Sequence, residues 1–407
     1  MPKLRIFNPE HDMALAFGGT NYTPTPLAQK LRRDLQMLPA WFSASNDSIL
    51  SRNPELDSTW AECINKRYKT SIKAVSTQEV GAFNDIEPWG WNRYLRRRLF
   101  LDGVQECFLP SEECINDIRN LSHRRISISF HHEFMEMIPE LQDNIPIESS
   151  DLNEVIDFAR KHPKAYVKAP WSSSGKGVYR ALDINALDFT RWCSGIIKRQ
   201  GSIMCEKPLC SIMDFAMEFR CDNGKTSFVG YSVFNNDTHS SFSGGLIMPT
   251  NALEDKIIAA IGNKELLLKV KECAMTILDK LIAPHYTGYA GIDMMVYRDE
   301  NGYARINPCI ELNLRTTMGI VTCSISNRYI SPGSYGEFHI EYHKDTITKD
   351  YILDIEHKYP VQITDDNKIK SGVQMLTPLY QDSQYCAFIH IFNSSLKSFC
   401  TGNPITL

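Results

Sequence analysis

The sequence predicts an α+β fold with more than one structural unit. The chain has 407 residues, which suffices for roughly two to three domains. Helical and strand-like patterns alternate clearly from residue 150 onward, and the last ~75 residues alternate apolar and polar side chains, as in FHIEYH and CAFIHIF. We therefore expect an α/β unit over 1–148, a central α+β unit over 149–335 and a β-rich segment over 336–407 that packs on the central unit.

The composition is that of an ordinary globular protein. Apolar residues make up 43% of the chain, charged residues 23%, and the formal net charge is −4. This balance argues against a protein that binds nucleic acid or an anionic membrane. No apolar run approaches the ~18 residues of a membrane-spanning helix, and the first residues lack the pattern of a secretory signal. The twelve cysteines show no C-x-x-C spacing, so we expect small buried thiols in a reducing cytoplasm.

The first 150 residues predict mixed helix and strand. A strand over 4–7 leads into the polar loop NPEHD over 8–12, and helices follow over 26–37 and 91–101. The end of a strand is a usual ligand position in α/β domains, but these polar residues could equally open a helix. The helix over 91–101 carries four arginines, which could receive a carboxylate or phosphate or form a solvated face. A loop at 144–146 marks the expected domain boundary.

From residue 150 onward the elements are more sharply delimited. The pattern predicts, in order, a helix over 151–161, strands over 165–170 and 178–182, a helix over 185–200 that ends at Gly201, strands over 202–209, 215–221 and 226–234, a glycine-rich loop over 242–250, two helices within 254–283 that break near Gly262, and a long hairpin over 288–315 with its turn at 299–302.

The loop between the strands 165–170 and 178–182 has the chemistry of a phosphate site. Its two glycines let backbone N–H groups approach an anion closely. Hydroxyl and ammonium donors surround them: Lys168, Ser172, Ser173, Ser174 and Lys176, with the glycines at Gly175 and Gly177. The pattern is not a Walker A loop, because Gly177 follows Lys176 and no helix pattern comes next, and it is not a dinucleotide-binding fingerprint, because it joins two strands. A solvated hairpin loop is the alternative, but Lys168 interrupts an apolar strand, where an unpaired ammonium is costly to bury.

The hairpin over 288–315 carries oxygen ligands on both arms. Glu311 and Asn313 are two residues apart and so share one face of their strand, and Asp293 lies on the facing arm. Such oxygens suit Mg²⁺ or Mn²⁺. Arg315 points to the same face and could pair with the carboxylates or neutralise a transferring phosphoryl group. Cross-strand charge pairs are the alternative, but they explain poorly why Glu311 and Asn313 lie among apolar strand residues.

Together these segments resemble the ATP-grasp superfamily over about 151–325. YVKAPWSSSGKGV resembles the flap that covers the triphosphate, IMCEKPL the hinge strand that meets adenine, and EFRCDNG the strand that follows. GIDMMVYRDENGYARINPCIELNLRTTMG resembles the metal-binding hairpin with its E-x-N-x-R pattern, the most specific of the four. The resemblance implies an ATP-grasp fold, in which two α+β subdomains enclose ATP, preceded by an α/β N-terminal domain.

The resemblance also implies a role for each matching residue. Lys168 would contact the nucleotide, as would the flap residues Ser173, Ser174, Gly175, Lys176 and Gly177. The hinge would consist of Glu206, Lys207 and Leu209, and Glu218 would lie on the ribose or substrate side. Mg²⁺ or Mn²⁺ would be held by Asp293, Glu311 and Asn313, and Arg315 and Lys168 would be catalytic. The superfamily usually has a further phosphate-binding lysine upstream of the flap, where LSHRRISISF offers Arg124 or Arg125 instead.

The implied function is an ATP- and Mg²⁺-dependent ligase that joins a small-molecule carboxylate to an amine through an acyl phosphate. Two alternatives stay open. One is an ATP-binding regulatory or scaffold protein that has lost ligase activity, and the other is a kinase on the same scaffold. We expect neither nucleic acid nor a membrane as partner, and the sequence leaves the oligomeric state open.

Overall fold

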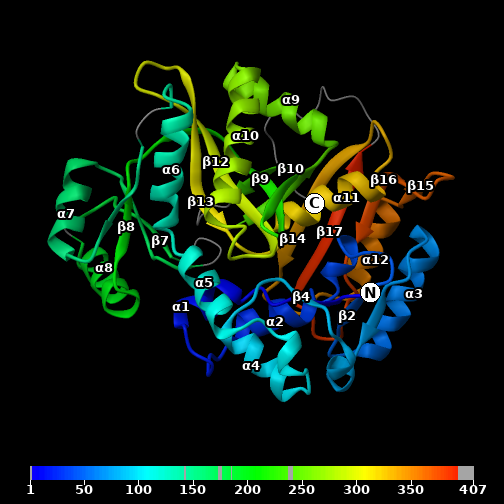
Figure 1. Ribbon diagram of the computed structural model, residues 1–407. Helices are drawn as coiled ribbons and strands as arrows, with labels where there is room; N and C mark the ends of the chain where they lie inside the picture. Colours follow the sequence, from blue (N-terminus) through cyan, green and yellow to red (C-terminus); the bar gives the residue numbers. More distant parts are fainter. Residues whose placement is uncertain (1, 142–143, 173–176, 185, 237–241, 393–407) are drawn as a thin grey trace.

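The computed structural model describes residues 2–141, 144–172, 177–184, 186–236 and 242–392, and these residues form three β-sheets (Figure 1). Two sheets have four strands and one has nine. In the view of Figure 1, the N-terminal elements lie at the bottom, one small sheet lies at the left with α7 and α8, and the large sheet lies between and to the right. Within the described residues, no helix combines the length and apolar character needed to cross a membrane.

The N-terminal sheet is parallel, with strand order β3-β2-β1-β4. Its strands are β1 (Leu4–Ile6), β2 (Ser48–Leu50), β3 (Lys73–Val75) and β4 (Ile86–Pro88). The helices of this part are α1 (His11–Phe17), α2 (Pro26–Asp34), α3 (Pro54–Tyr68), α4 (Arg93–Leu101) and α5 (Glu112–Leu121), with 3₁₀ turns at Leu38–Trp41, Thr77–Ala82 and Glu106–Phe108. Because parallel strands end at the same edge of a sheet, the loops that follow β1, β2 and β4 are neighbours.

The second four-stranded sheet is antiparallel, with order β5-β8-β6-β7. Its elements are β5 (Ile147–Ser149), α7 (Leu152–Lys161), β6 (Tyr166–Lys168), β7 (Val178–Arg180), α8 (Leu187–Gln200) and β8 (Ile203–Glu206). Gly201 ends α8 in the left-handed conformation with φ of 91°, as the sequence predicts. Val155, Phe189 and Cys193 belong to the core that holds both helices against the sheet, where they pack with strand residues such as Val167 and Ile203.

The nine-stranded sheet has the order β13-β12-β9-β10-β11-β14-β17-β16-β15. Its strands are β9 (Cys210–Asp222), β10 (Lys225–Asn236), β11 (Phe242–Ile247), β12 (Gly288–Arg298), β13 (Ala304–Asn313), β14 (Tyr335–Tyr342), β15 (Gln362–Ile363), β16 (Ile369–Met375) and β17 (Tyr385–Phe392). The helices associated with it are α6 (Ile126–Met137), α9 (Thr250–Ile261), α10 (Lys264–Leu281), α11 (Met318–Tyr329) and α12 (Lys349–Lys358).

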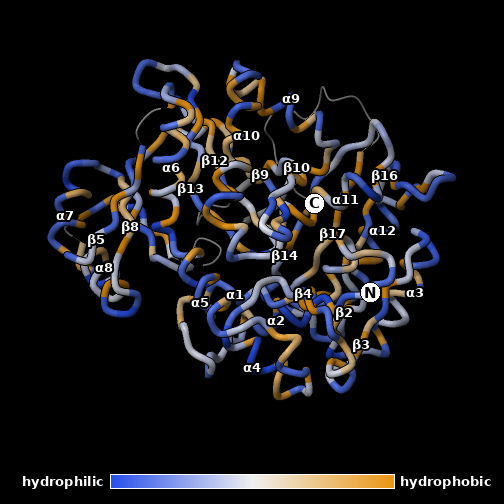
Figure 2. The backbone as a smooth tube through the Cα atoms, in the orientation of Figure 1, coloured by the Kyte–Doolittle hydropathy of each residue, from blue (hydrophilic) through white to orange (hydrophobic). Residues whose placement is uncertain are grey.

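Two apolar cores cover different parts of the large sheet. One joins α6 and α10 to β9, β10, β12 and β13, and it includes Phe130, Phe215 and Ile277. The other joins the N-terminal unit to α11, β14 and β17, and it includes Trp41 and Phe338. Figure 2 shows apolar stretches along the inner strands and polar segments at the outer turns. The N-terminal unit and the strands β14 and β17 therefore share one hydrophobic core.

Several sequence predictions about single elements can be compared with the structure. The helix break at Gly262 and the hairpin turn at 299–302 are confirmed, and Cys205, Cys221 and Cys309 are buried. The expected loop over 242–250 is wrong in its first half, because residues 242–247 form β11. A β-carbon at Gly244 would lie 2.8 Å from the carbonyl oxygen of Phe338, so this glycine allows two strands to approach closely. The segment after 335 is mainly strand but also contains α12.

Candidate active site

Lys168 is the last residue of β6 and points toward the hinge strand β8. Its Nζ donates to Oε2 of Glu206 at 2.6 Å, and the two side chains are only 9% and 15% exposed. The buried ammonium predicted from the sequence therefore has a carboxylate partner, which offsets the cost of burial. Of the other two hinge residues, Lys207 is exposed and Leu209 is half-buried. Within the described part of the chain, Lys207 forms no hydrogen bond or ion pair with Lys168 or Glu206.

The flap begins directly after Lys168. Ser173, Ser174, Gly175 and Lys176, which we expected at the triphosphate, lie outside the described residues. At the two ends of this segment, the backbone N–H of Ala169 donates to the carbonyl of Gly177 at 2.7 Å. A β-carbon at Gly177 would lie 2.2 Å from Cβ of Ser172, so the closure of this loop requires glycine at position 177.

The acidic hairpin consists of β12 and β13, which pair so that Asp293 lies directly opposite Glu311 and Gly291 opposite Asn313. Nδ2 of Asn313 donates to Oδ2 of Asp293 at 3.2 Å. Burial, followed by the nearby carboxylates of Glu311 and Glu218, raises the pKa of Asp293 well above its usual value. The three residues therefore bring several oxygen atoms to one face of the hairpin, at a place where negative charge is unfavourable unless a cation compensates it.

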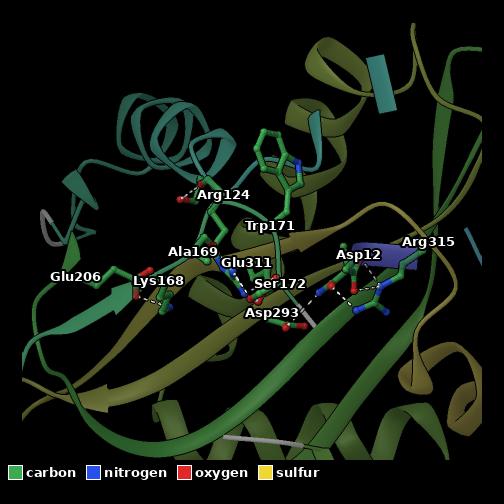
Figure 3. A network of polar contacts seen from close by, with 12 residues as sticks. Asp12, Arg124, Lys168, Ala169, Trp171, Ser172, Glu206, Asp293, Glu311 and Arg315 are labelled. Carbon is green, nitrogen blue, oxygen red and sulfur yellow. Dashed lines mark hydrogen bonds and ion pairs between the residues drawn. The ribbon is translucent and has the colours of Figure 1, made fainter. Parts of the chain in front are cut away.

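Arg124 connects the flap with the acidic hairpin (Figure 3). Its Nη1 donates to the carbonyl oxygen of Ala169 at 2.6 Å and to Oγ of Ser172 at 2.7 Å. Its Nη2 donates to both carboxylate oxygens of Glu311, at 2.8 and 2.9 Å. Arg125 instead forms an ion pair with Glu148 and its side chain is 57% exposed. Of the two arginines upstream of the flap, the structure thus places Arg124 in the site.

Arg315 connects the hairpin with the N-terminal unit. Its Nε donates to both oxygens of Asp12, at 3.2 and 3.0 Å, and its Nη2 donates to Oδ1 of Asn313 at 2.9 Å. Burial alone would lower the pKa of Arg315, but the carboxylates of Asp12, Glu311 and Asp293 outweigh it and raise this pKa above its usual value. A small cleft opens between these groups and the flap, lined by Asp12, Trp171, Ser172, Glu311 and Asn313 together with four neighbours.

Glu218 lies behind the acidic hairpin and is 1% exposed. Its carboxylate accepts hydrogen bonds from Oγ of Ser232 at 2.9 Å and from Oγ1 of Thr317 at 2.8 Å, and burial raises its pKa to about 7. Thr317 caps α11, and a β-carbon at Gly319 would lie 1.8 Å from Oε1 of Glu218. The hydrogen bonds of Glu218 thus come from β10 and from the start of α11, and its expected place on the ribose or substrate side stays a prediction.

Sequence reasoning missed two contacts of this site. Asp12 was noted as a polar loop residue, but its pairing with Arg315 spans 303 positions and leaves no local pattern. Trp171 lies in the quoted flap motif, yet its packing is visible only in the structure. The Arg119 guanidinium lies 3.9 Å from the Trp171 ring, and Nε1 of Trp171 donates to the carbonyl of Arg119 at 2.9 Å.

The described elements have the arrangement of an ATP-grasp fold, as the sequence motifs predict, and the likeness to solved structures supports this fold. A scan against protein-family models and a search of curated proteins found no match. Among the solved structures, biotin carboxylase of Campylobacter jejuni in complex with an ATP analogue is similar over 98% of this chain and 89% of its own, at 13% identity and a TM-score of 0.54. The biotin carboxylase domain of 2-oxoglutarate carboxylase from Hydrogenobacter thermophilus, with MgADP, ADP and bicarbonate, is similar over 95% and 85%, at 11% identity and a TM-score of 0.52.

Proposed function

We propose that the protein is an ATP- and Mg²⁺-dependent ligase that joins a carboxylate to an amine through an acyl phosphate. The observation that carries this proposal is the position of Arg124, which contacts the flap at Ala169 and Ser172 and the acidic hairpin at Glu311. These are the two sides that would enclose the triphosphate. The likeness in fold to biotin carboxylases solved with an ATP analogue and with MgADP supports the same position for a nucleotide.

The oxygen atoms of the hairpin fit a divalent cation. Asp293 and Glu311 face each other on paired strands, and the raised pKa of Asp293 reflects their mutual repulsion as well as burial. When bound by Asp293, Glu311 and Asn313, Mg²⁺ would neutralise charge on phosphate oxygens. Guanidinium groups now contact the oxygens of Glu311 and Asn313, so cation binding is expected to compete with the contacts from Arg124 and Arg315.

The side chains around the cleft would bind phosphate oxygens and stabilise the charge that develops in this reaction. Lys168, positioned by Glu206, would donate to phosphate oxygens, and Arg315, positioned by Asp12, would stabilise charge on the transferring phosphoryl group. A carboxylate oxygen of the substrate bonds to the γ-phosphorus while the bond to the bridging oxygen breaks and ADP leaves. The amine nitrogen then bonds to the acyl carbon, phosphate leaves, and the nitrogen loses a proton.

Hydroxylamine trapping tests the proposal. The protein is incubated with MgATP, hydroxylamine and a panel of amino acids, peptides and small carboxylic acids, and ADP and hydroxamate are measured together. We expect a substrate-dependent hydroxamate in amounts that match ADP. ADP without hydroxamate, but with a stable phosphate ester, would indicate a kinase. Tight MgATP binding without ADP release across the panel would favour a regulatory protein. Either of these results would overturn the ligase proposal.

A further inference from the structure

A second group of charged side chains lies at the carboxyl edge of the parallel N-terminal sheet. Glu10 follows β1 and comes just before α1, Arg32 is on α2, Arg52 follows β2, and Arg98 is on α4. These residues are far apart in the sequence, and the topology of the sheet brings their elements to one edge. Asp12, two residues beyond Glu10, contacts Arg315 of the candidate active site.

Glu10 is buried with part of its hydrogen-bonding capacity unused. Nη1 of Arg32 donates to Oε1 of Glu10 at 2.6 Å, and the Glu10 side chain is 1% exposed. Within the described residues, neither Oε2 of Glu10 nor Nε of Arg32 has a hydrogen-bond partner. A buried carboxylate oxygen without a donor is costly, so this oxygen is well placed to accept a hydrogen bond from a ligand.

Positive charge exceeds negative charge around Glu10. The side chains of Arg52 and Arg98 form no ion pair within the described residues, and the nearest polar contact of Arg98 is a 3.4 Å hydrogen bond to the phenol of Tyr94. Burial, followed by repulsion from Arg32 and Arg98, lowers the pKa of Arg52. Arg32 alone forms an ion pair with Glu10, and Arg52 and Arg98 add two further guanidinium groups whose repulsion an additional anion would relieve.

We propose that Arg32, Arg52 and Arg98 bind a carboxylate or phosphate group of the small-molecule substrate, and that Oε2 of Glu10 accepts a hydrogen bond from an N–H or O–H group of the same molecule. This inference rests on the proposed ligase function and specifies that one of the two substrates carries an anionic group. The link from Glu10 through Asp12 and Arg315 to Asn313 connects this anion site with the acidic hairpin. The remainder of the substrate would extend toward the cleft that contains Asp12.

Titration with two probes, inorganic phosphate and glycine, tests the anion site by isothermal calorimetry. The variants are Arg52→Gln and Arg98→Gln, and the control is Arg160→Gln, which removes the same charge from an exposed residue of α7 whose ion pair among the described residues is with Asp157 on the same helix. We expect one probe to bind the wild type and the control equally, and to bind each variant at least about tenfold more weakly. Binding of phosphate alone identifies a phosphate-bearing substrate, and binding of glycine alone a carboxylate.

Two results would overturn the inference: binding of neither probe to the wild type, or equal binding to the wild type and both variants. MgADP titration of the same proteins separates this outcome from a failure of the ligase proposal, because the arginines are not part of the nucleotide site. If all proteins bind MgADP but no probe binding depends on Arg52 or Arg98, the anion site is wrong and the ligase proposal stands. If the wild type does not bind MgADP, the assignment of the anion to a ligase substrate is wrong, whatever the probes do.

Discussion

Replacing Glu311 by Gln removes a charge from the acidic hairpin at nearly constant volume, and its effects on stability and on cation binding should differ sharply. Glu311 accepts two hydrogen bonds from Arg124, and its side chain is 27% exposed. Hydrogen bonds to a charged group contribute about 1.5–3 kcal/mol when buried, and less with this exposure. The substitution also relieves the repulsion that raises the pKa of Asp293. Because these effects oppose each other, we expect the unfolding free energies of the Glu311→Gln variant and the wild type to differ by less than about 1 kcal/mol.

Cation affinity should fall much further. The Gln variant retains only one of the two facing carboxylates, and loss of a ligand should weaken Mn²⁺ binding in the presence of ADP at least about 100-fold. Electron paramagnetic resonance of free Mn²⁺ measures this affinity without knowledge of the ligase substrates, and urea unfolding measures stability. Glu300→Gln, at the exposed tip of the same hairpin, is the matched control and should bind Mn²⁺ like the wild type. A folded Glu311→Gln protein with wild-type Mn²⁺ affinity would refute the metal assignment.

Three further predictions concern the nucleotide lysine, the buried glutamate and the shared core. Lys168→Met leaves Glu206 unpaired and should cost about 2–3 kcal/mol in urea unfolding; the double variant with Glu206→Gln should regain that stability yet bind MgADP at least about tenfold more weakly in calorimetry, and wild-type affinity there would contradict the role of Lys168. Because burial raises the folded pKa of Glu218 from 4.5 to about 7, the stability due to its protonated form is complete below about pH 4.5 and is lost as pH rises through about 7. Between about pH 5 and about pH 8, the free energy of unfolding of the Glu218→Gln variant should therefore fall by up to roughly 3 kcal/mol less than that of the wild type. Identical dependence of the unfolding free energy on pH in the two proteins would argue against this. Phe338→Ala removes a fully buried ring and should lower the unfolding free energy by about 3–5 kcal/mol, whereas a loss below about 1 kcal/mol would show that Phe338 is not a core residue.

The sequence predicts best those parts whose contacts are local. The hairpin over 288–315 is predicted correctly because alternating apolar residues flank a turn sequence. In that turn, Oδ1 of Asp299 accepts hydrogen bonds from the backbone N–H groups of Asn301 and Tyr303. The pairing of two consecutive strands across one turn also places Asp293 opposite Glu311. The two helices around Gly262 are likewise determined locally, since Gly262 adopts φ of 75°.

The parts that the sequence leaves open or does not predict depend on tertiary contacts. Arg124 and Arg125 are identical in type and adjacent, and only the turn that leads into α6 decides which one reaches Glu311. The glycine-rich segment before α9 predicts a loop because glycine disfavours strands, but the close approach of Phe338 that lets Gly244 pair in β11 is a tertiary feature. The partner of Arg315 lies at the opposite end of the chain and has no signature near residue 315.

The pairing of Asp12 with Arg315 has a consequence for synthesis of the chain. While the ribosome translates the first three hundred codons, the nascent polypeptide lacks the guanidinium that Asp12 contacts and the strands that cover Trp41. An apolar face of the N-terminal segment then stays exposed to solvent until the strands with Phe338 and Ile389 have been synthesised. We therefore expect the N-terminal unit to complete its fold only after these strands are synthesised, and premature termination before them should yield aggregation-prone fragments rather than an autonomous N-terminal unit.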